Sequence, residues 1–304
     1  MEMNVLYNVP HEFALSPIIS TYFYLLGVGG GCSLLSVWAT LTGKTAYKPL
    51  AKIGAVFVVL LFSGAPVLLI VDLGQPLRFW YFMTLFNATS PLSWGAVFLI
   101  SYPVFAGAYI IFLFLGITKI YKILAKALLP VAIGYVTYIG FAVALGIGTS
   151  AWNTPIMPAY FVSGAMTSGI ALMAMVGIIR HRLLSKSWGP EMAIADTDII
   201  VKLTRFAALF LLINLFFIFS QQVHMRFGSE WSVLAAQLLL SGKMGMNFGL
   251  FTLALGTVLP LAVLAVPKLN RNMAALFVIM FLAELGILVM RFSITTGSQY
   301  LPTM

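Results

Sequence analysis

The feature that most constrains this chain is a series of long apolar runs that are almost free of charge. A helix must contain about 20 apolar residues to cross the hydrocarbon core of a bilayer. Eight runs reach that length, at 18–41, 53–72, 93–116, 127–148, 157–179, 206–225, 247–266 and 273–294. They predict an all-α membrane protein with eight transmembrane helices, which places both termini on the same side of the membrane.

The charge-free stretch 127–179 is too long for a single span, so we expect a break inside it. Trp152 and Asn153 suit a membrane interface, and Pro155 and Pro158 each lack the amide donor that a helix interior needs. The break at these residues separates the fourth predicted span from the fifth.

Charged residues are few and unevenly placed. They make up 8% of the 304 residues, whereas 61% are hydrophobic, and soluble domains contain roughly 25% charged residues. The net charge of +9 therefore indicates membrane topology and does not indicate a nucleic-acid partner, since Lys and Arg concentrate in cytoplasmic connectors. The alternate connectors hold 13 of the 17 basic residues, at 42–52, 117–126, 180–205 and 267–272. We expect these connectors to be cytoplasmic and both termini to be extracytoplasmic.

A polar and aromatic connector, residues 72–95, joins the second and third runs. It begins at Asp72 and contains Arg78 and Trp94 among several turn-forming residues. Asp72 has two interpretations. It could end its helix and pair with Arg78, or it could accept a proton at a functional site, since ionisable residues in spans are costly.

The histidines and the cysteine exclude several redox centres. A bis-histidine haem needs two His side chains inside the helix bundle. His181 lies at the cytoplasmic end of the fifth predicted span and His224 at the outer end of the sixth. His11 precedes the first span. Cys32 is the only cysteine, so it cannot assemble an iron–sulfur cluster. We expect no haem, iron–sulfur cluster or catalytic metal in this chain.

Tyrosines provide polar groups inside the predicted spans. Tyr135 and Tyr138 lie three residues apart and therefore share one helix face. Tyr22 and Asp72 are expected at the same outer membrane level. A quinone head group needs donors to two carbonyl oxygens, a proton acceptor and an apolar cleft, which this combination could supply. Each tyrosine taken alone could equally be a packing or interface residue.

Glu284 is the second acid within a span, near the middle of the last run. It could pair with a polar face of a neighbouring helix, or it could take part in a proton path.

Several motifs resemble those of the NrfD/PsrC family, the integral membrane subunits of polysulfide reductase-type complexes. The first is Asp-Leu-Gly-Gln-Pro-Leu-Arg-Phe-Trp-Tyr at 72–81, followed by Ser-Pro-Leu-Ser-Trp-Gly at 90–95. Similar motifs occur in the glycine-rich stretch 22–31, at 138–158 and at 270–299. The resemblance covers the whole chain.

The resemblance implies two side-by-side four-helix bundles, residues 1–148 with a quinone site and residues 149–304. It implies menaquinone or ubiquinone as the ligand and an iron–sulfur subunit with four ferredoxin-like clusters as the partner, often with a molybdopterin catalytic subunit. Tyr138 matches a tyrosine implicated in quinone binding. Tyr22 lies near a position where some members carry histidine, and His11 is a candidate substitute.

The leading hypothesis is a quinol-oxidising or quinone-reducing anchor in the cytoplasmic membrane of a prokaryote. In it, Asp72 and Tyr138 are the reactive residues, and the head group contacts Tyr22, Tyr135 and Arg78, with His11 and Trp94 as further candidates. The alternatives are a proton- or solute-translocating module that uses Glu284, and a passive anchor without a quinone site.

Overall fold

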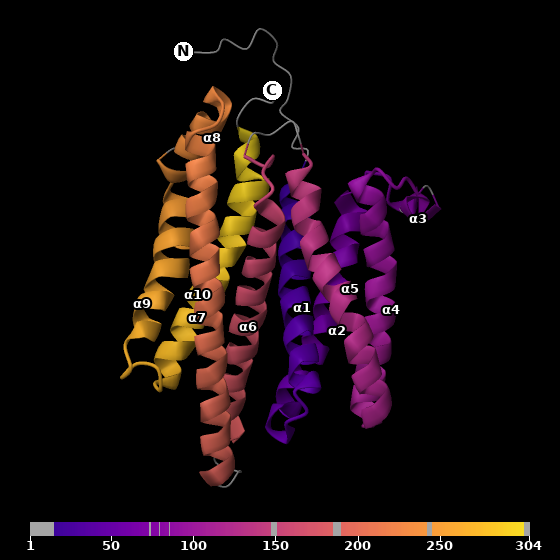
Figure 1. Ribbon diagram of the computed structural model, residues 1–304, viewed down its shortest axis with the longest axis vertical. Coiled ribbons are helices and arrows are strands. Elements are labelled where there is room, and N and C mark those ends of the chain that lie inside the picture. Colours follow the sequence, from indigo (N-terminus) through magenta and orange to yellow (C-terminus); the bar gives the residue numbers. More distant parts are fainter. Residues whose placement is uncertain are drawn as a thin grey trace.

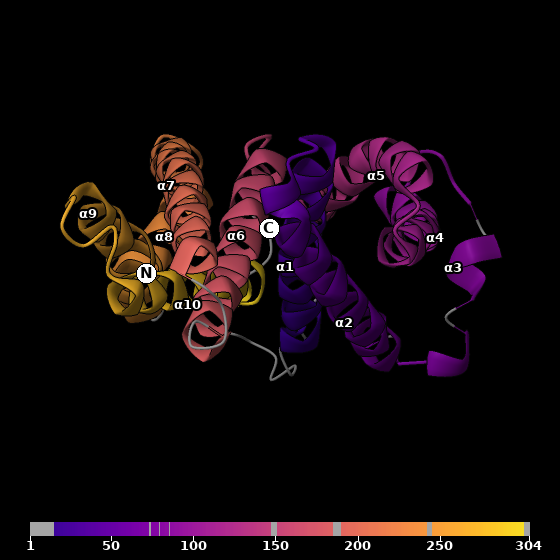
Figure 2. The same ribbon diagram turned by 90° about the horizontal axis from the view of Figure 1, so that it is seen from below.

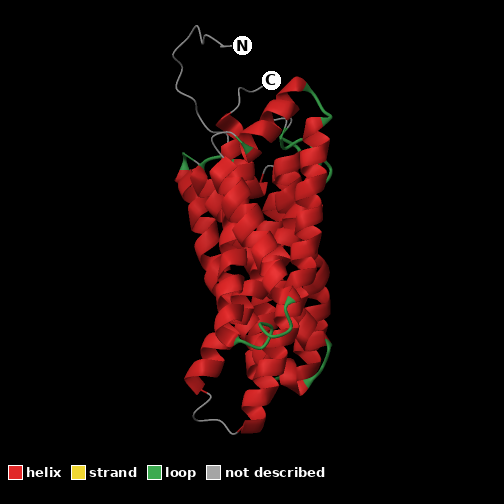
Figure 3. Cartoon of the chain, turned by 90° about the vertical axis from the view of Figure 1, so that its left-hand side faces the viewer, coloured by secondary structure: helices red, strands yellow, loops and turns green. Residues whose placement is uncertain are grey.

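The structure is a computed structural model that describes residues 15–72, 74–78, 80–84, 86–146, 151–184, 190–241 and 245–300. These residues form helices and short connectors, with no strand among them (Figure 3). The first half contains α1 (Pro17–Leu41), η1 (Thr45–Tyr47), α2 (Lys48–Asp72), η2 (Pro76–Arg78), α3 (Tyr81–Thr84), α4 (Pro91–Leu115) and α5 (Thr118–Ala144). The second contains α6 (Met157–Leu184), α7 (Pro190–Arg226), α8 (Glu230–Leu240), η3 (Met246–Val258), α9 (Leu259–Ala265), α10 (Met273–Thr295) and η4 (Gly297–Tyr300).

The predicted membrane architecture is confirmed. Eight helical segments of the described chain are long and apolar enough to cross a bilayer, and they lie roughly side by side along the long axis of the molecule (Figure 1). The protein is therefore a multi-pass integral membrane protein. Its short α3 and its α8 lie at the same end of the molecule as the start of α1 and the end of α10 (Figure 1).

Several helices begin earlier than the apolar runs predict. α2 begins at Lys48 rather than at 53, α5 at Thr118 rather than at 127, and α7 at Pro190 rather than at 206. The apolar run measures only the part inside hydrocarbon, whereas a helix continues into the interface, where lysine and arginine side chains can reach water.

The seventh span also differs from a simple α-helix. Its first part, η3, is a π-helix of 13 residues that leads into α9. Pro260 has no amide hydrogen, so it cannot donate to a preceding carbonyl. The Thr257 hydroxyl donates to the carbonyl oxygen of Thr252 at 2.9 Å, which satisfies an acceptor within this wider helix.

α1 and α6 form the centre of the molecule. α1 packs against α2, α5, α6 and α10, and α6 packs against α1, α5, α7 and α10 (Figure 2). Gly31 of α1 lies directly on the backbone of α6, where a Cβ atom would overlap the carbonyl group of Ala165. Small residues thus allow the close helix approach that drives packing in lipid. The division into bundles at residue 148 stays a prediction.

The two ends of the described chain are joined at one end of the molecule. The side chain of Gln299 accepts a hydrogen bond from the Leu15 amide at 3.1 Å and donates one to the Leu15 carbonyl at 2.8 Å. The Ser20 hydroxyl lies 2.6 Å from that of Thr296. The ends therefore lie on the same side, as an even number of spans requires, and which side is extracytoplasmic stays a prediction.

Candidate functional site

The structure gathers four tyrosines between α1, α4 and α5. Tyr22 of α1 lies close to Tyr135 and Tyr138 of α5. Tyr102 of α4 stacks on Tyr135 with ring centroids 5.1 Å apart. We call these four residues the tyrosine cluster. The structure therefore brings together Tyr22, Tyr135 and Tyr138 of the predicted quinone site, with Tyr102 beside them. Asp72, which was predicted to join them, contacts Ser16 instead.

Two phenylalanines form the apolar wall of the tyrosine cluster. The Phe62 ring of α2 lies 4.3 Å from the Tyr102 centroid and 5.3 Å from that of Tyr135. The Phe98 ring of α4 lies 5.9 Å from that of Tyr138. Hydroxyl groups and flat apolar rings therefore occur side by side, which is the mixed lining that ligand sites commonly show.

Some hydroxyls of the tyrosine cluster lack partners. Tyr102 and Tyr135 are almost fully buried, and neither hydroxyl has a hydrogen bond of ordinary geometry to any described residue. The nearest polar groups are the hydroxyls of Ser33 for Tyr102 and of Tyr22 for Tyr135. A buried polar group without a partner costs roughly 1–3 kcal/mol. The protein interior therefore holds hydroxyl donors that could be satisfied by an external acceptor, such as a carbonyl oxygen.

Gly95 fixes the position of Tyr138. A Cβ atom at Gly95, near the start of α4, would overlap the Tyr138 hydroxyl. The tyrosine therefore lies directly against the α4 backbone, at a place that only glycine leaves open. This contact links the 72–95 connector, which ends at Gly95, to the tyrosine cluster.

Asp72 makes a different contact from the one considered with Arg78. Its carboxylate accepts a short hydrogen bond from the Ser16 hydroxyl. Ser16 is the N-cap of α1, where its side chain also accepts from the amides of Ile18 and Ile19. Arg78 is exposed and donates to the Gln75 side chain at 3.1 Å. Within the described chain, Asp72 and Arg78 form no ion pair.

Trp94, the chain neighbour of Gly95, is directed elsewhere in its polar contact. Trp94 is exposed, and its indole nitrogen donates to the Ala88 carbonyl at 3.0 Å. Its ring packs edge-on against Phe86. His11 lies outside the described residues.

Glu284 is paired with a tyrosine across the centre of the molecule. The Tyr24 hydroxyl donates to Glu284 Oε1 at 2.5 Å, so α1 and α10 are joined by a buried polar contact. The other carboxylate oxygen is buried and has no partner among the described residues. The pairing with a polar neighbour is therefore present, and it does not exclude a proton path.

Sequence reasoning assigned no role to Arg291 beyond membrane topology. Its side chain is only 1% exposed, donates to the Phe161 carbonyl at 2.8 Å and lies 3.7 Å from the Phe161 ring centroid. Its Nε and Nη1 atoms have no partner in the described part of the chain. An arginine within an apolar run was the available signal, because charges inside a span are expensive.

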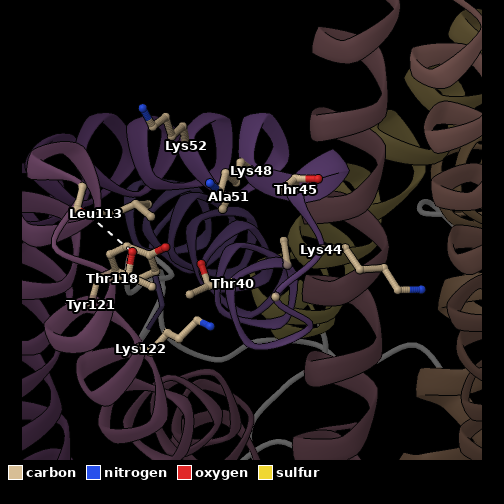
Figure 4. A pocket seen from close by; sticks show the side chains of 13 residues that line it. Thr40, Lys44, Thr45, Lys48, Ala51, Lys52, Leu113, Thr118, Tyr121 and Lys122 are labelled. Atoms are coloured by element: carbon tan, nitrogen blue, oxygen red, sulfur yellow. Dashed lines mark hydrogen bonds between the residues drawn. The ribbon is translucent and has the colours of Figure 1, made fainter. Parts of the chain in front are cut away.

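Three cavities lie away from the tyrosine cluster. The first, of about 280 Å³, lies beside the last turn of α1 and has four lysines among its lining residues (Figure 4). The second, of about 30 Å³, adjoins the ion pair of Arg180 and Asp196. The third, of about 500 Å³, lies between η3 and α10 and has a mostly apolar lining. None of the three is lined by a predicted quinone-site residue.

Comparison with known proteins agrees with the motifs. The sequence profile of the family described as polysulphide reductase, NrfD, matches residues 10–302. The C subunit of the polysulfide reductase of Wolinella succinogenes is 26% identical, over 92% of this chain and 93% of its own length. A protein named NrfD homolog from Haemophilus influenzae is 25% identical over the same shares.

A further relative matches a smaller part of this chain. The Hdr-like menaquinol oxidoreductase integral membrane subunit of Archaeoglobus fulgidus is 22% identical over 56% of this chain and 43% of its own length. The profile match spans nearly all of the sequence, and the eight apolar helices fit a membrane subunit. The chain therefore belongs to the NrfD family of polysulfide reductase-type membrane subunits.

Proposed function

We propose that this protein is the quinone-reactive membrane anchor of a respiratory oxidoreductase complex in a prokaryotic cytoplasmic membrane. It would exchange electrons between the membrane pool of menaquinone or ubiquinone and an extracytoplasmic iron–sulfur subunit. The observation that carries the proposal is the tyrosine cluster, whose buried hydroxyls lack partners beside the Phe62 and Phe98 rings. The name of the Archaeoglobus relative, a menaquinol oxidoreductase subunit, supports the same chemistry.

A bound quinol supplies two electrons and two protons when it is oxidised, and the opposite direction consumes them. In our proposal, the hydroxyls of Tyr22, Tyr135 and Tyr138 donate hydrogen bonds to the ring oxygens and orient the head group. The Phe62 and Phe98 rings shield it from water. The loose packing of α2 against α4 supports lateral entry of an apolar tail from the bilayer.

Asp72 acts in this proposal at the end of α2. Its carboxylate is held by the Ser16 hydroxyl, so its position is fixed relative to the start of α1. It would accept the two protons of the head group one after the other and pass each to the water outside, because the residue is partly exposed.

Electrons must leave through a partner. The chain has a single cysteine, which cannot hold a cluster, so the proposal includes a docked iron–sulfur subunit with ferredoxin-like clusters and a molybdopterin or other catalytic subunit beyond it. The 72–95 connector offers a docking surface, since Leu77 is 89% exposed and Trp80 and Tyr81 are also exposed. Large exposed apolar side chains often mark interaction sites.

The test uses the intact complex and the variants Tyr138→Phe and Tyr135→Phe. We expect quinol-dependent turnover to fall, with KM for quinol rising by roughly 2- to 12-fold per hydroxyl, because a hydrogen bond contributes about 0.5–1.5 kcal/mol. Turnover driven by an artificial reductant that feeds the partner subunit directly is expected to stay unchanged.

Tyr121→Phe is the matched control, because Tyr121 is a buried tyrosine of the same helix α5 near its other end. It should leave quinol turnover at the wild-type level. Full quinol turnover in both Tyr135→Phe and Tyr138→Phe would contradict the site. Co-purification without any iron–sulfur subunit would contradict the anchor role.

A second candidate function is proton transfer through Glu284, which is favoured by its 2.5 Å contact with Tyr24 and by its partnerless second oxygen. In vesicles containing the whole complex, Glu284→Gln should reduce proton uptake or release per electron and leave electron transfer intact. An unchanged proton-to-electron ratio would remove this candidate.

A further inference from the structure

The lysine-rich cavity lies beside the last turn of α1, between α1, α2, α4 and α5 (Figure 4). Its volume is about 280 Å³, and its lining includes Lys44, Lys48, Lys52 and Lys122. We call it the lysine cavity. None of the lining residues is acidic. Small-molecule sites usually measure about 300–1,000 Å³, so the lysine cavity suits a compact polar group.

The positive charge of the lysine cavity is not neutralised by the protein. The sequence has no Asp or Glu from 13 to 71 or from 73 to 190. The only acidic residue in the helices that form the cavity is therefore Asp72, which ends α2 some 20 residues after Lys52. Among the described residues, none of the four lysines forms an ion pair. The lysine cavity therefore has a net positive charge that would attract an anion.

The backbone adds to the positive electrostatic potential in the lysine cavity. α5 begins at Thr118, and its start borders the lysine cavity. The N-terminal end of a helix carries a partial positive charge and amide donors without internal partners. Gly116, with φ of 77°, ends α4 in the left-handed conformation and allows α5 to begin two residues later. Phosphate groups bind well in such surroundings.

Hydroxyl groups lie at the base of the lysine cavity. The Thr40 hydroxyl is 2.7 Å from the Tyr109 hydroxyl, which also lies 2.9 Å from Ser36 Oγ. In Figure 4 the side chains of Lys48 and Lys122 end on opposite sides of Thr40. Those of Lys44 and Lys52 extend away from it. The ammonium groups of Lys48 and Lys122 thus lie on either side of the Thr40 hydroxyl, which is hydrogen-bonded to Tyr109.

The surroundings of the lysine cavity favour a lipid. Lys52 Nζ lies 5.5 Å from the centroid of the Phe114 ring. Phe114 is 51% exposed and the adjacent Leu115 is 65% exposed, so an apolar surface continues directly from the cavity edge. Acyl chains can cover this surface while a headgroup phosphate meets the lysines. Basic pockets between transmembrane helices commonly receive anionic headgroups.

We propose that the lysine cavity is a binding site for the headgroup phosphate of an anionic phospholipid. The site is separate from the tyrosine cluster, and the proposal does not depend on quinone chemistry. The bound lipid would hold the ends of α1, α2, α4 and α5 together at this membrane surface.

The test measures lipid binding to the full-length protein by native mass spectrometry. Phosphatidylglycerol and phosphatidylcholine are titrated separately. We compare Lys48→Gln/Lys122→Gln with Lys119→Gln/Lys126→Gln, which removes the same charge from α5 but lies outside the lining. At about 1 kcal/mol per lysine, phosphatidylglycerol affinity should fall roughly 25-fold in the first variant. The second variant should change it only slightly.

Three results would overturn the proposal. The first is equal phosphatidylglycerol binding by both double variants, and the second is no preference over phosphatidylcholine. The third is displacement of the lipid by millimolar inorganic phosphate, with phosphate binding itself lost in Lys48→Gln/Lys122→Gln, which would identify a site for a free anion. If the first variant does not fold, the single variant Lys122→Gln should still show a roughly 5-fold loss.

Discussion

The hydroxyl of Tyr24 on α1 donates a 2.5 Å hydrogen bond to the carboxylate of Glu284 on α10. This contact joins residues 260 positions apart and connects the first and last spans inside the membrane. The bilayer interior offers no water to either group, so each depends on the other. The pair is therefore a structural link between α1 and α10.

Loss of the Tyr24 hydroxyl should destabilise the protein. Tyr24→Phe should lower the free energy of unfolding by about 1.5–3 kcal/mol if it removes a hydrogen bond to a charged acceptor. The measurement is thermal unfolding in detergent, in a double-mutant cycle with Glu284→Leu. Tyr81→Phe, at an exposed tyrosine of the connector, is the control. Strict additivity of the two substitutions would contradict the pairing.

Close backbone contact between α1 and α6 predicts an effect at Gly31. Gly31→Ala places a methyl group into the carbonyl group of Ala165, and overpacking of this kind costs about 1–3 kcal/mol. Gly107→Ala in α4 is the control, because nothing lies within 4 Å of a Cβ atom there. The thermal midpoint should fall only for Gly31→Ala, and equal midpoints would rule out the close approach.

The contact between Gly95 and Tyr138 predicts a kinetic effect. Gly95→Ala would push the Tyr138 hydroxyl from its place without removing it. We expect a several-fold higher KM for quinol in the intact complex and normal turnover with an artificial reductant. Gly107→Ala serves again as the control on the same helix. An unchanged KM would show that the position of Tyr138 does not affect quinol binding.

The hydrogen bond from Ser16 to Asp72 predicts an effect on α1. Ser16→Ala removes both the N-cap of α1 and the donor to the carboxylate. The loss of a serine cap costs about 0.5–2 kcal/mol, which thermal unfolding should detect. Thr21→Ala, which removes an exposed hydroxyl bonded only to the Pro17 carbonyl, should have little effect. A comparable loss in both variants would argue against the cap.

The exposed connector predicts where a partner binds. Leu77→Asp places a charge on a side chain that is 89% exposed, so folding should be unaffected while retention of the iron–sulfur subunit in purification falls. Leu183→Asp, at a 74% exposed leucine near the end of α6, is the control. Retention lost equally in both variants would indicate general damage.

The sequence predicted the spans well because hydrocarbon thickness sets a length that apolar runs must match. It predicted helix starts poorly at Lys48 and Thr118, since charged residues can continue a helix beyond the hydrocarbon. The π-helix η3 had no recognised signal other than Pro260, whose missing donor is compatible with several local geometries.

The candidate site was predicted in part. Tyr135 and Tyr138 could be paired from helix periodicity, and Tyr22 joins them in the structure. Tyr102 was missed because one tyrosine in an apolar run is indistinguishable from a packing residue until its neighbours are known. The Ser16 partner of Asp72 also required the fold, since the residues are 56 positions apart.

The central claim is that a quinone head group binds at the tyrosine cluster. The most direct measurement is photo-crosslinking of an azido-quinone to the intact complex, followed by peptide mapping. We expect adducts on peptides that contain Tyr22, Tyr102 or Tyr138, with labelling suppressed by excess unmodified quinone. Competable adducts confined to the cavity between η3 and α10, with none on the tyrosine peptides, would contradict the account.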